Sequence, residues 1–245
     1  MPLGVVIFLL AVWIVTSRMR LYPDYLFPYP GSVLDSLREE WSTGRLVKDT
    51  VASLFRVVVG WSLGAVLGVP LGLWLGLRVL PRTALLPLVN FGRSLSPLAW
   101  IQFAILWFQI GDKAAIFLIF LAVFFPLVLT TLSSVASIPS IFFRVARDYD
   151  IRGMALLTQV TLPAILPDLI TALRVSAGLA WVVIVAAEMV GCTDGLGYAI
   201  YDARNGERID TVLCVMIVIG LLGVLLDRLL AQLTKFPNVR WGYDR

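Results

Sequence analysis

The sequence predicts an all-α membrane protein with six transmembrane helices, and three observations lead to this fold class. Of the 245 residues, 59% are hydrophobic and 15% are charged, whereas a soluble domain carries about 25% charged residues. The mean hydropathy is +0.89. The apolar residues gather in runs of about 20 residues, the length at which a helix crosses a bilayer. One globular core could not bury so much apolar surface, so the bilayer is expected to cover it.

The composition also excludes several classes of function. The net charge is only +4 and the basic residues are scattered, so no nucleic acid is expected as a partner. The chain has no histidine, the commonest general base and metal ligand. Its two cysteines, Cys192 and Cys214, form neither a disulfide framework nor a zinc site. A bridge between them is compatible with their positions, but two free thiols are favoured. We therefore expect no catalytic residue, no metal site and no enzymatic activity.

The chain begins with the first predicted span, residues 1–17. These residues are apolar from the start and lack the basic segment and cleavage site of a signal peptide, so an uncleaved helix is expected. Residues 18–52 form a polar and aromatic segment outside the membrane. Within this segment, three prolines precede Ser32–Trp41, where apolar residues recur on one side as in a short amphipathic helix.

The second predicted span, Ser53–Leu77, carries a glycine at every fourth position. Glycines at this spacing form a flat stripe on which the backbone of another helix packs closely. The spacing does not decide whether that helix belongs to the same chain or to a second copy. Pro70 is expected to bend the span. The stripe consists of Gly60, Gly64, Gly68, Gly72 and Gly76.

Four more spans complete a five-helix core over residues 53–233, followed by a short basic tail at 234–245. A tight turn is expected at Arg78–Arg82 and a flexible polar loop at Gly191–Asp210. The third to sixth spans are placed at Leu85–Phe108, Ala114–Leu132, Ala164–Val190 and Thr211–Leu233.

A charged island, Phe142–Pro163, interrupts the apolar pattern. Its apolar residues Phe142, Val145, Ala146 and Tyr149 recur at helical spacing and predict one face against the protein. The opposite face is expected to meet a partner, and it carries Arg144, Arg147, Asp148 and Ile151. Periodicity alone equally allows a solvated helix that only joins two spans.

Several ionisable residues fall inside predicted spans, where charges are costly and mark functional sites. One interpretation is a polar lining of a translocation path, whose excess of arginine favours a small anion. The other is snorkelling or structural ion pairing, which is favoured for Arg56, while Glu188 lies near the end of its span and is positioned to pair with an arginine. The residues assigned to the path are Arg93, Ser94, Ser96, Arg174 and Glu188.

The charged island resembles the cytoplasmic coupling loop of ABC-importer permeases. That loop reads Glu-Ala-Ala, three residues, Gly, nine residues, Ile, one residue, Leu-Pro. Here Arg144-Val145-Ala146, Asp150, Val160 and Leu162-Pro163 keep the spacing and the final Leu-Pro, but the Glu and the Gly are replaced. Four other stretches resemble permeases of the nitrate, sulfonate, taurine and bicarbonate importers: Ser53–Leu77, Arg93–Gly111, Leu173–Met189 and Gly195–Leu213.

This resemblance implies a type I ABC-importer permease fold, a binding-protein-dependent transport inner membrane component, with a coupling helix at about 140–163. The chain has no phosphate-binding glycine loop, so ATP and magnesium are expected in separate ABC ATPase subunits and no cofactor is expected in this chain. The coupling contacts implied by the resemblance are Arg144, Ala146, Arg147, Asp148, Asp150, Arg152, Leu162 and Pro163.

The resemblance further implies a homodimer in membrane lipid, in the bacterial inner membrane, with both termini cytoplasmic and residues 18–52 extracytoplasmic. A periplasmic substrate-binding protein is expected to dock on the outer segment at Asp202, Arg204, Glu207 and Arg208. The implied function is import of nitrate, sulfonate, taurine or bicarbonate by alternating access. Two alternatives stay open: import of a thiamine-precursor-like or riboflavin-like solute, and a membrane scaffold or carrier without ATP coupling.

Overall fold

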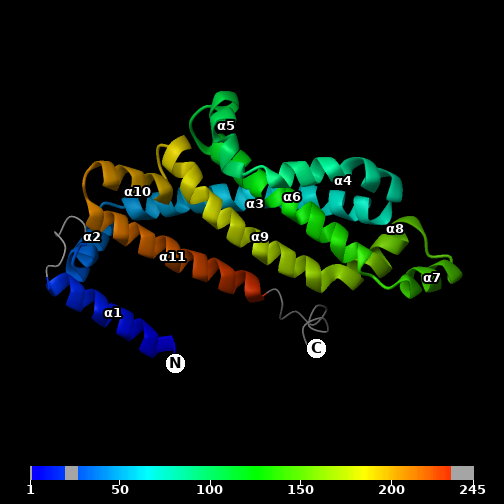
Figure 1. Cartoon of the computed structure of the whole chain (residues 1–245), viewed down its shortest axis with the longest axis horizontal. Coiled ribbons are helices and arrows are strands. Elements are labelled where there is room, and N and C mark those ends of the chain that lie inside the picture. Colours follow the sequence, from blue (N-terminus) through cyan, green and yellow to red (C-terminus); the bar gives the residue numbers. More distant parts are fainter. Residues whose placement is uncertain (1, 20–26, 233–245) are drawn as a thin grey trace.

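The computed structural model describes residues 2–19 and 27–232, and all regular elements in this part of the chain are helices (Figure 1). The molecule is elongated. The short helices α2 (Pro30–Ser42) and α10 (Leu196–Asn205) lie at one end, called here the α10 end. The short helices α7 (Ser140–Asp148) and α8 (Gly153–Leu156) lie at the other, the α7 end. The predicted all-α fold is therefore confirmed for the described residues.

Four helical stretches are long and apolar enough to cross a membrane. Three of them are α3 (Arg45–Leu77), α6 (Asp112–Ala136) and α11 (Ile209–Ala231). The fourth runs over Gly153–Gly191. It is continuous through α8, the π-helical η2 (Leu157–Thr161) and α9 (Leu162–Gly191).

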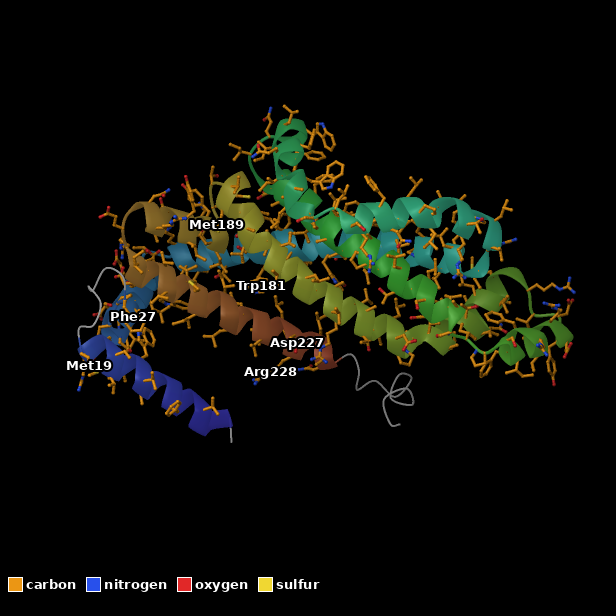
Figure 2. The ribbon with its side chains drawn as sticks, viewed as in Figure 1. Met19, Phe27, Trp181, Met189, Asp227 and Arg228 are labelled. Carbon is orange, nitrogen blue, oxygen red and sulfur yellow. The ribbon has the colours of Figure 1, made fainter. Side chains whose placement is uncertain are left out.

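The core is built where α3, α6 and α9 pack together. Ile119 and Val123 of α6 are completely buried, as is Ile184 of α9. On the other side of α9, the Trp181 indole donates a hydrogen bond to the Ile219 carbonyl of α11 at 3.1 Å. Figure 2 shows Trp181 on α9, beside α11. These contacts fix the three core spans against one another and attach the last span to α9.

The glycine stripe of α3 faces α6 of the same chain. A Cβ on Gly60 would lie 2.7 Å from Ile119 Cβ, and one on Gly64 would lie 2.6 Å from a Val123 methyl group. A Cβ on Gly72 would meet the Val128 carbonyl oxygen at 2.7 Å. The two backbones thus approach closely enough to require glycine, and the neighbour left open by the sequence is α6.

The predicted third span, Leu85–Phe108, is wrong as a single helix. The chain instead forms α4 (Val79–Ser94), a 3₁₀ turn η1 (Pro97–Trp100) and α5 (Ile101–Phe108). Leu95 and Ser96 between them are extended. Pro97 accounts for the break, because the residue before a proline is disfavoured in the helical region. Figure 1 shows α5 projecting away from the α3–α6 pair.

Two connecting segments also differ from expectation. The turn expected at Arg78–Arg82 is confined to Arg78, because α4 begins at Val79. The segment expected as a loop, Gly191–Asp210, contains α10, whose Leu196, Ala199 and Ala203 are buried. Their spacing gives α10 an apolar side. That pattern was obscured in the sequence by the interleaved charges.

The terminal segments are only partly described. The predicted first span corresponds to α1 (Pro2–Arg18), where the Trp13 indole donates to the Pro28 carbonyl at 3.2 Å. The helix predicted at Ser32–Trp41 corresponds to α2. The next helix, α3, begins at Arg45, earlier than the predicted Ser53. The tail at 234–245 lies outside the described residues.

Candidate functional site

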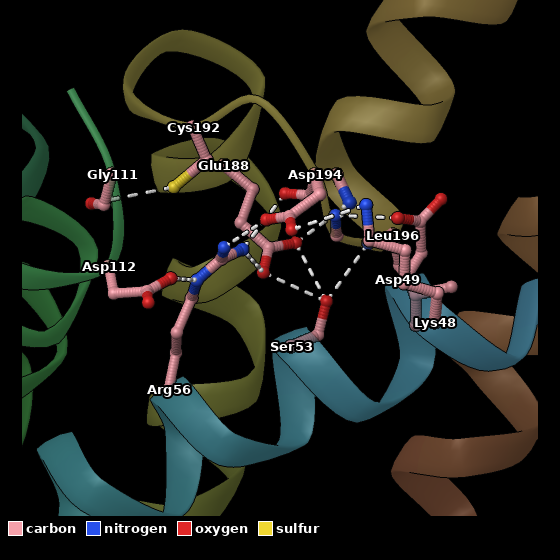
Figure 3. Close-up of polar contacts among 12 residues, drawn as sticks. Lys48, Asp49, Ser53, Arg56, Gly111, Asp112, Glu188, Cys192, Asp194 and Leu196 are labelled. Atoms are coloured by element: carbon pink, nitrogen blue, oxygen red, sulfur yellow. Dashed lines mark hydrogen bonds and ion pairs between the residues drawn. The ribbon is translucent and has the colours of Figure 1, made fainter. Parts of the chain in front are cut away.

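A buried ion-pair network occupies the α10 end, and Arg56 of α3 is its centre (Figure 3). The Arg56 side chain is 2% exposed and Glu188 of α9 is 0% exposed. Arg56 Nη1 donates to Glu188 Oε1 at 2.7 Å, and Nε donates to Asp112 Oδ1 of α6 at 2.7 Å. The guanidinium also pairs with the Asp194 carboxylate and donates to the Asp194 carbonyl at 2.9 Å. One side chain therefore joins three spans and the loop before α10.

The same network holds the first residues of α10. The Gly197 amide donates to Glu188 Oε2 at 2.9 Å, the Leu196 amide to Ser53 Oγ at 2.9 Å, and the Gly195 amide to Asp49 Oδ1 at 3.0 Å. These amides would otherwise lack partners at the start of the helix. Gly195 has φ +104, and a Cβ there would lie 2.5 Å from Glu188 Cδ. Only glycine fits this close approach.

The two cysteines are both free and buried. Cys192 follows α9 and its thiol lies 3.8 Å from the Gly111 carbonyl. Burial raises the pKa of the Cys192 thiol to about 12, because removal from water disfavours the charged thiolate. Burial and a raised pKa are typical of a structural cysteine, in which the neutral thiol is favoured.

Of the four charges expected to dock a partner on the outer segment, two are held within the chain. Asp202 accepts from Arg45 Nη2 at 2.5 Å, and Arg208 Nη2 donates to Glu39 of α2 at 2.7 Å. The hydrogen bond to Glu39 raises the pKa of Arg208 and keeps it charged. Arg204 and Glu207 are exposed and form no ion pair with the described residues. The free part of this surface is therefore Arg204 and Glu207.

The residues assigned to a translocation path do not form one cluster. Arg93, Ser94 and Ser96 are exposed at the end of α4, and Ser94 Oγ donates to the Asn90 carbonyl at 2.9 Å. Arg174 of α9 forms a bidentate pair with Asp227 of α11, with both distances 2.7 Å. Asp227 lies near the end of α11 in Figure 2.

Glu188, the last of the path residues, belongs to the buried network and is closed to solvent. The sequence missed Arg56 as a site residue. The signal in the sequence that could have identified Arg56 is that several acidic residues lie near the predicted ends of the spans.

At the α7 end, α7 stands largely clear of the spans. Only Ala146 of its nine residues, all described, is buried. Phe142, Val145 and Tyr149 are 52%, 46% and 78% exposed. The expectation that this apolar face packs against the protein is therefore wrong for all but Ala146. The other side chains project over a hollow of about 890 Å³ between α7 and the start of α9.

The charged residues of α7 point in two directions. At 3.6 residues per turn, Arg144 and Asp148 lie opposite the buried Ala146 and so face outward. Arg147 lines a second hollow of about 700 Å³, together with Arg152. The outward side of α7 is thus defined by Arg144 and Asp148.

The turn after α7 keeps the bend that the family motif makes with glycine. Asp150, at the glycine position, has φ +53, a left-handed conformation that aspartate tolerates better than most residues. The Ile151 amide donates to the Ala146 carbonyl at 2.8 Å and the Asp150 amide to the Arg147 carbonyl at 3.0 Å. This is the Schellman pattern that ends many helices. The aspartate at the glycine position therefore adopts the left-handed conformation that glycine favours.

Comparisons with known proteins agree on one family. The model of the family described as "Binding-protein-dependent transport system inner membrane component" matches residues 68–236. The bicarbonate transport system permease protein CmpB of Synechococcus elongatus is 38% identical over 188 residues, 76% of this chain and 68% of the relative. The taurine transport system permease protein TauC of Escherichia coli is 31% identical over 232 residues, 93% and 84% of the two chains.

Two further comparisons extend this likeness. The nitrate import permease protein NrtB of Leptolyngbya laminosa is 38% identical over 178 residues, which cover 73% of this chain and 64% of the relative. Among solved structures, an inward-facing conformation of the MetNI methionine ABC transporter aligns with a TM-score of 0.69 at 21% identity. The alignment covers 78% of this chain and 94% of that chain. At this identity the structural likeness concerns the fold.

Proposed function

Because this chain belongs to the family of binding-protein-dependent transport inner membrane components, we propose that it imports a small anion by ATP-driven alternating access. It is an ABC-importer permease with the type I fold, a transport subunit and not an enzyme. The proposed solute belongs to the nitrate, sulfonate, taurine or bicarbonate class. The relatives named for bicarbonate, taurine and nitrate transport support this choice.

The observation that carries the proposal is the exposure of α7. This charged helix stands clear of the spans and turns Arg144 and Asp148 outward, as a docking element would. ATP and magnesium bind to the partner ATPase, which supplies the energy. When two ATPase subunits close on ATP, each moves one α7, and two copies of the permease change between outward-open and inward-open states.

Four of the eight proposed coupling residues are assigned individual roles. Arg144 and Asp148 contact the ATPase directly. Ala146 anchors α7 to the spans, and Asp150 makes the turn that joins it to α8. The coupling motif ends where α9 starts. In the proposed mechanism, a movement of α7 therefore displaces a single continuous helix. The remaining members of the set are Arg147, Arg152, Leu162 and Pro163.

Co-purification tests the coupling role. We expect the chain, expressed with its ATPase in mild detergent, to bind two ATPase subunits per permease pair. Arg144→Glu should lose them and abolish coupled ATP hydrolysis, because it reverses the outward charge. Arg228→Glu, which changes the same charge near the end of α11, is the matched control and should retain them. Purification of the wild-type chain without ATPase would instead favour a scaffold or an uncoupled carrier.

The substrate proposal depends on Arg93. Unlike Arg174, Arg93 is exposed and forms no ion pair with the described residues, so its charge is available to an anion. We expect Arg93→Ala to reduce uptake of a small anion about tenfold or more in reconstituted vesicles, since a hydrogen bond to a charged group contributes about 1.5–3 kcal/mol. ATPase binding should be unchanged. Arg82→Ala, at the other end of α4, is the control, and equal uptake by both variants would refute the role of Arg93.

Orientation and partners complete the proposal. The α7 end faces the cytoplasm, and the α10 end faces the substrate-binding protein outside the bacterial inner membrane. Arg204 and Glu207 are the proposed docking charges, because Asp202 and Arg208 are engaged within the chain. The permease works as a homodimer in membrane lipid, with both termini in the cytoplasm.

A further inference from the structure

Two hollows flank α7, and their linings have opposite chemistry. The hollow of about 890 Å³ includes Asp168 and, among the described residues that line it, no arginine or lysine. The hollow of about 700 Å³ includes Arg147 and Arg152 and, among its described lining residues, no aspartate or glutamate. We call the second one the arginine pocket. Of these two hollows, judged by the described residues, the arginine pocket is the one that offers positive charge to a ligand.

The arginine pocket is also amphipathic. Its walls include Leu77 of α3, Val135 of α6 and Phe143 of α7. Arg147 forms no ion pair with the described residues, and Arg152 is paired at 2.8 Å with Asp150, where both side chains are largely exposed. An exposed pair of this kind is weak, so Arg152 can exchange its partner. The pocket therefore combines two available guanidinium groups with apolar walls.

The arginine pocket lies at the ends of two candidate spans. Leu77 is the last residue of α3, and Val135 lies in the last turn of α6. Both helices are candidate spans that end at this level. Arginine binds phosphate in a bidentate, charge-assisted geometry, and basic pockets between helix ends are typical sites for anionic headgroups.

We propose that the arginine pocket binds the phosphate of an anionic phospholipid, with an acyl chain along the apolar walls. Arg147 and Arg152 hold the phosphate. We assign this lipid to the cytoplasmic leaflet. That assignment rests on the proposed function, whereas the binding of the lipid does not. The site is separate from the outward side of α7, because Arg144 and Asp148 do not line the pocket. A bound lipid would thus contact α7 on the side of Arg147, while the ATPase contacts the outward side at Arg144 and Asp148.

Lipid retention by the full chain tests the proposal. The chain is purified in a non-ionic detergent and incubated with phosphatidylglycerol or phosphatidylcholine of the same acyl chains. Bound lipid is then counted by native mass spectrometry, with inorganic phosphate as a competitor. We expect Arg147→Gln/Arg152→Gln to weaken phosphatidylglycerol binding roughly 30-fold, equivalent to about 2 kcal/mol for two basic residues. Arg147→Lys/Arg152→Lys, which keeps both charges, should lose far less and shows that the sites tolerate substitution.

The matched control is Arg144→Gln/Arg228→Gln, which removes two exposed charges that do not line the arginine pocket. It should bind phosphatidylglycerol as the wild type does. Equal loss in this control would show that only net charge matters and would overturn the site. Equal retention of phosphatidylcholine would overturn the headgroup assignment. Displacement by inorganic phosphate at the same concentration would replace the lipid with a soluble phosphate ligand. None of these outcomes involves ATPase binding, so failure here is distinct from failure of the proposed function.

Discussion

At the scale of single residues, Arg56 shows how a buried charge, whose desolvation costs free energy, can connect several helices. Desolvating an arginine and a glutamate costs several kcal/mol per ion, and good geometry with further hydrogen bonds must offset that cost. Glu188 has these partners in Arg56, Ser53 and the Gly197 amide. We infer that the network contributes mainly specificity, because Arg56 pairs with Asp112 of α6 and Glu188 of α9 and so fixes which helix ends meet.

Removing one partner of this buried ion pair should strongly destabilise the protein. We expect Arg56→Gln to lower the free energy of unfolding by about 3–5 kcal/mol, because it leaves Glu188 buried without a cation. Thermal unfolding in detergent, followed by tryptophan fluorescence, measures the change. Arg38→Gln removes an exposed arginine whose pair with Asp35 is 3.4 Å long, and it should change stability by less than about 1 kcal/mol. If both variants melt together, the network does not hold the fold.

Sequence reasoning could locate Arg56 in a span but not identify its partners. Asp112 and Glu188 lie 56 and 132 residues away from Arg56 along the chain. Local sequence patterns do not predict contacts over such separations. The position of Arg56 one turn into the predicted helix favoured snorkelling or structural ion pairing, and the structure shows the ion pairing. By contrast, the Asp150 turn was recognisable as a motif position, although only the backbone showed that aspartate keeps the left-handed bend.

At the scale of elements, the glycine stripe of α3 was predictable because its cause is local. A four-residue repeat of glycine is visible in the sequence, while the choice of α6 as neighbour depends on the whole bundle. The broken third span shows the opposite case. Hydropathy favoured one helix over Leu85–Phe108, and the conformational effect of Pro97 on the residue before it outweighed that pattern.

The closeness of α3 and α6 leads to a direct prediction. Gly72→Ala should destabilise the chain by about 1–3 kcal/mol, because the new methyl group would meet the Val128 carbonyl at 2.7 Å and the backbones would have to separate. Gly220→Ala in α11 has no atom within 4 Å of the new Cβ. It should be neutral or stabilising by up to about 1 kcal/mol. Melting temperatures in one detergent compare the two, and a Gly72→Ala variant as stable as Gly220→Ala would contradict the packing.

At the scale of the whole molecule, one long helix extends between the α7 end and the α10 end. The stretch Gly153–Gly191 contains 39 residues, about 58 Å at 1.5 Å per residue, and the hydrocarbon core is about 30 Å thick. The helix therefore extends beyond the bilayer. It begins next to α7 and ends in the network that holds α10, so one helix connects the two ends of the molecule. The proposed function, in which the permease is driven from one side and loaded from the other, requires such a connection.

That arrangement predicts opposite accessibility of the two ends. Cys192 and Cys214 are buried, so the native chain provides a low background for a membrane-impermeant maleimide. In spheroplasts, Arg204→Cys on α10 should label immediately, and Arg144→Cys on α7 should label only after the membrane is permeabilised. Both positions are exposed, so neither substitution should disturb packing. The reverse pattern would place α7 outside the cell, where no ATP-driven partner could reach it, and the coupling role of Arg144 and Asp148 would have to be abandoned.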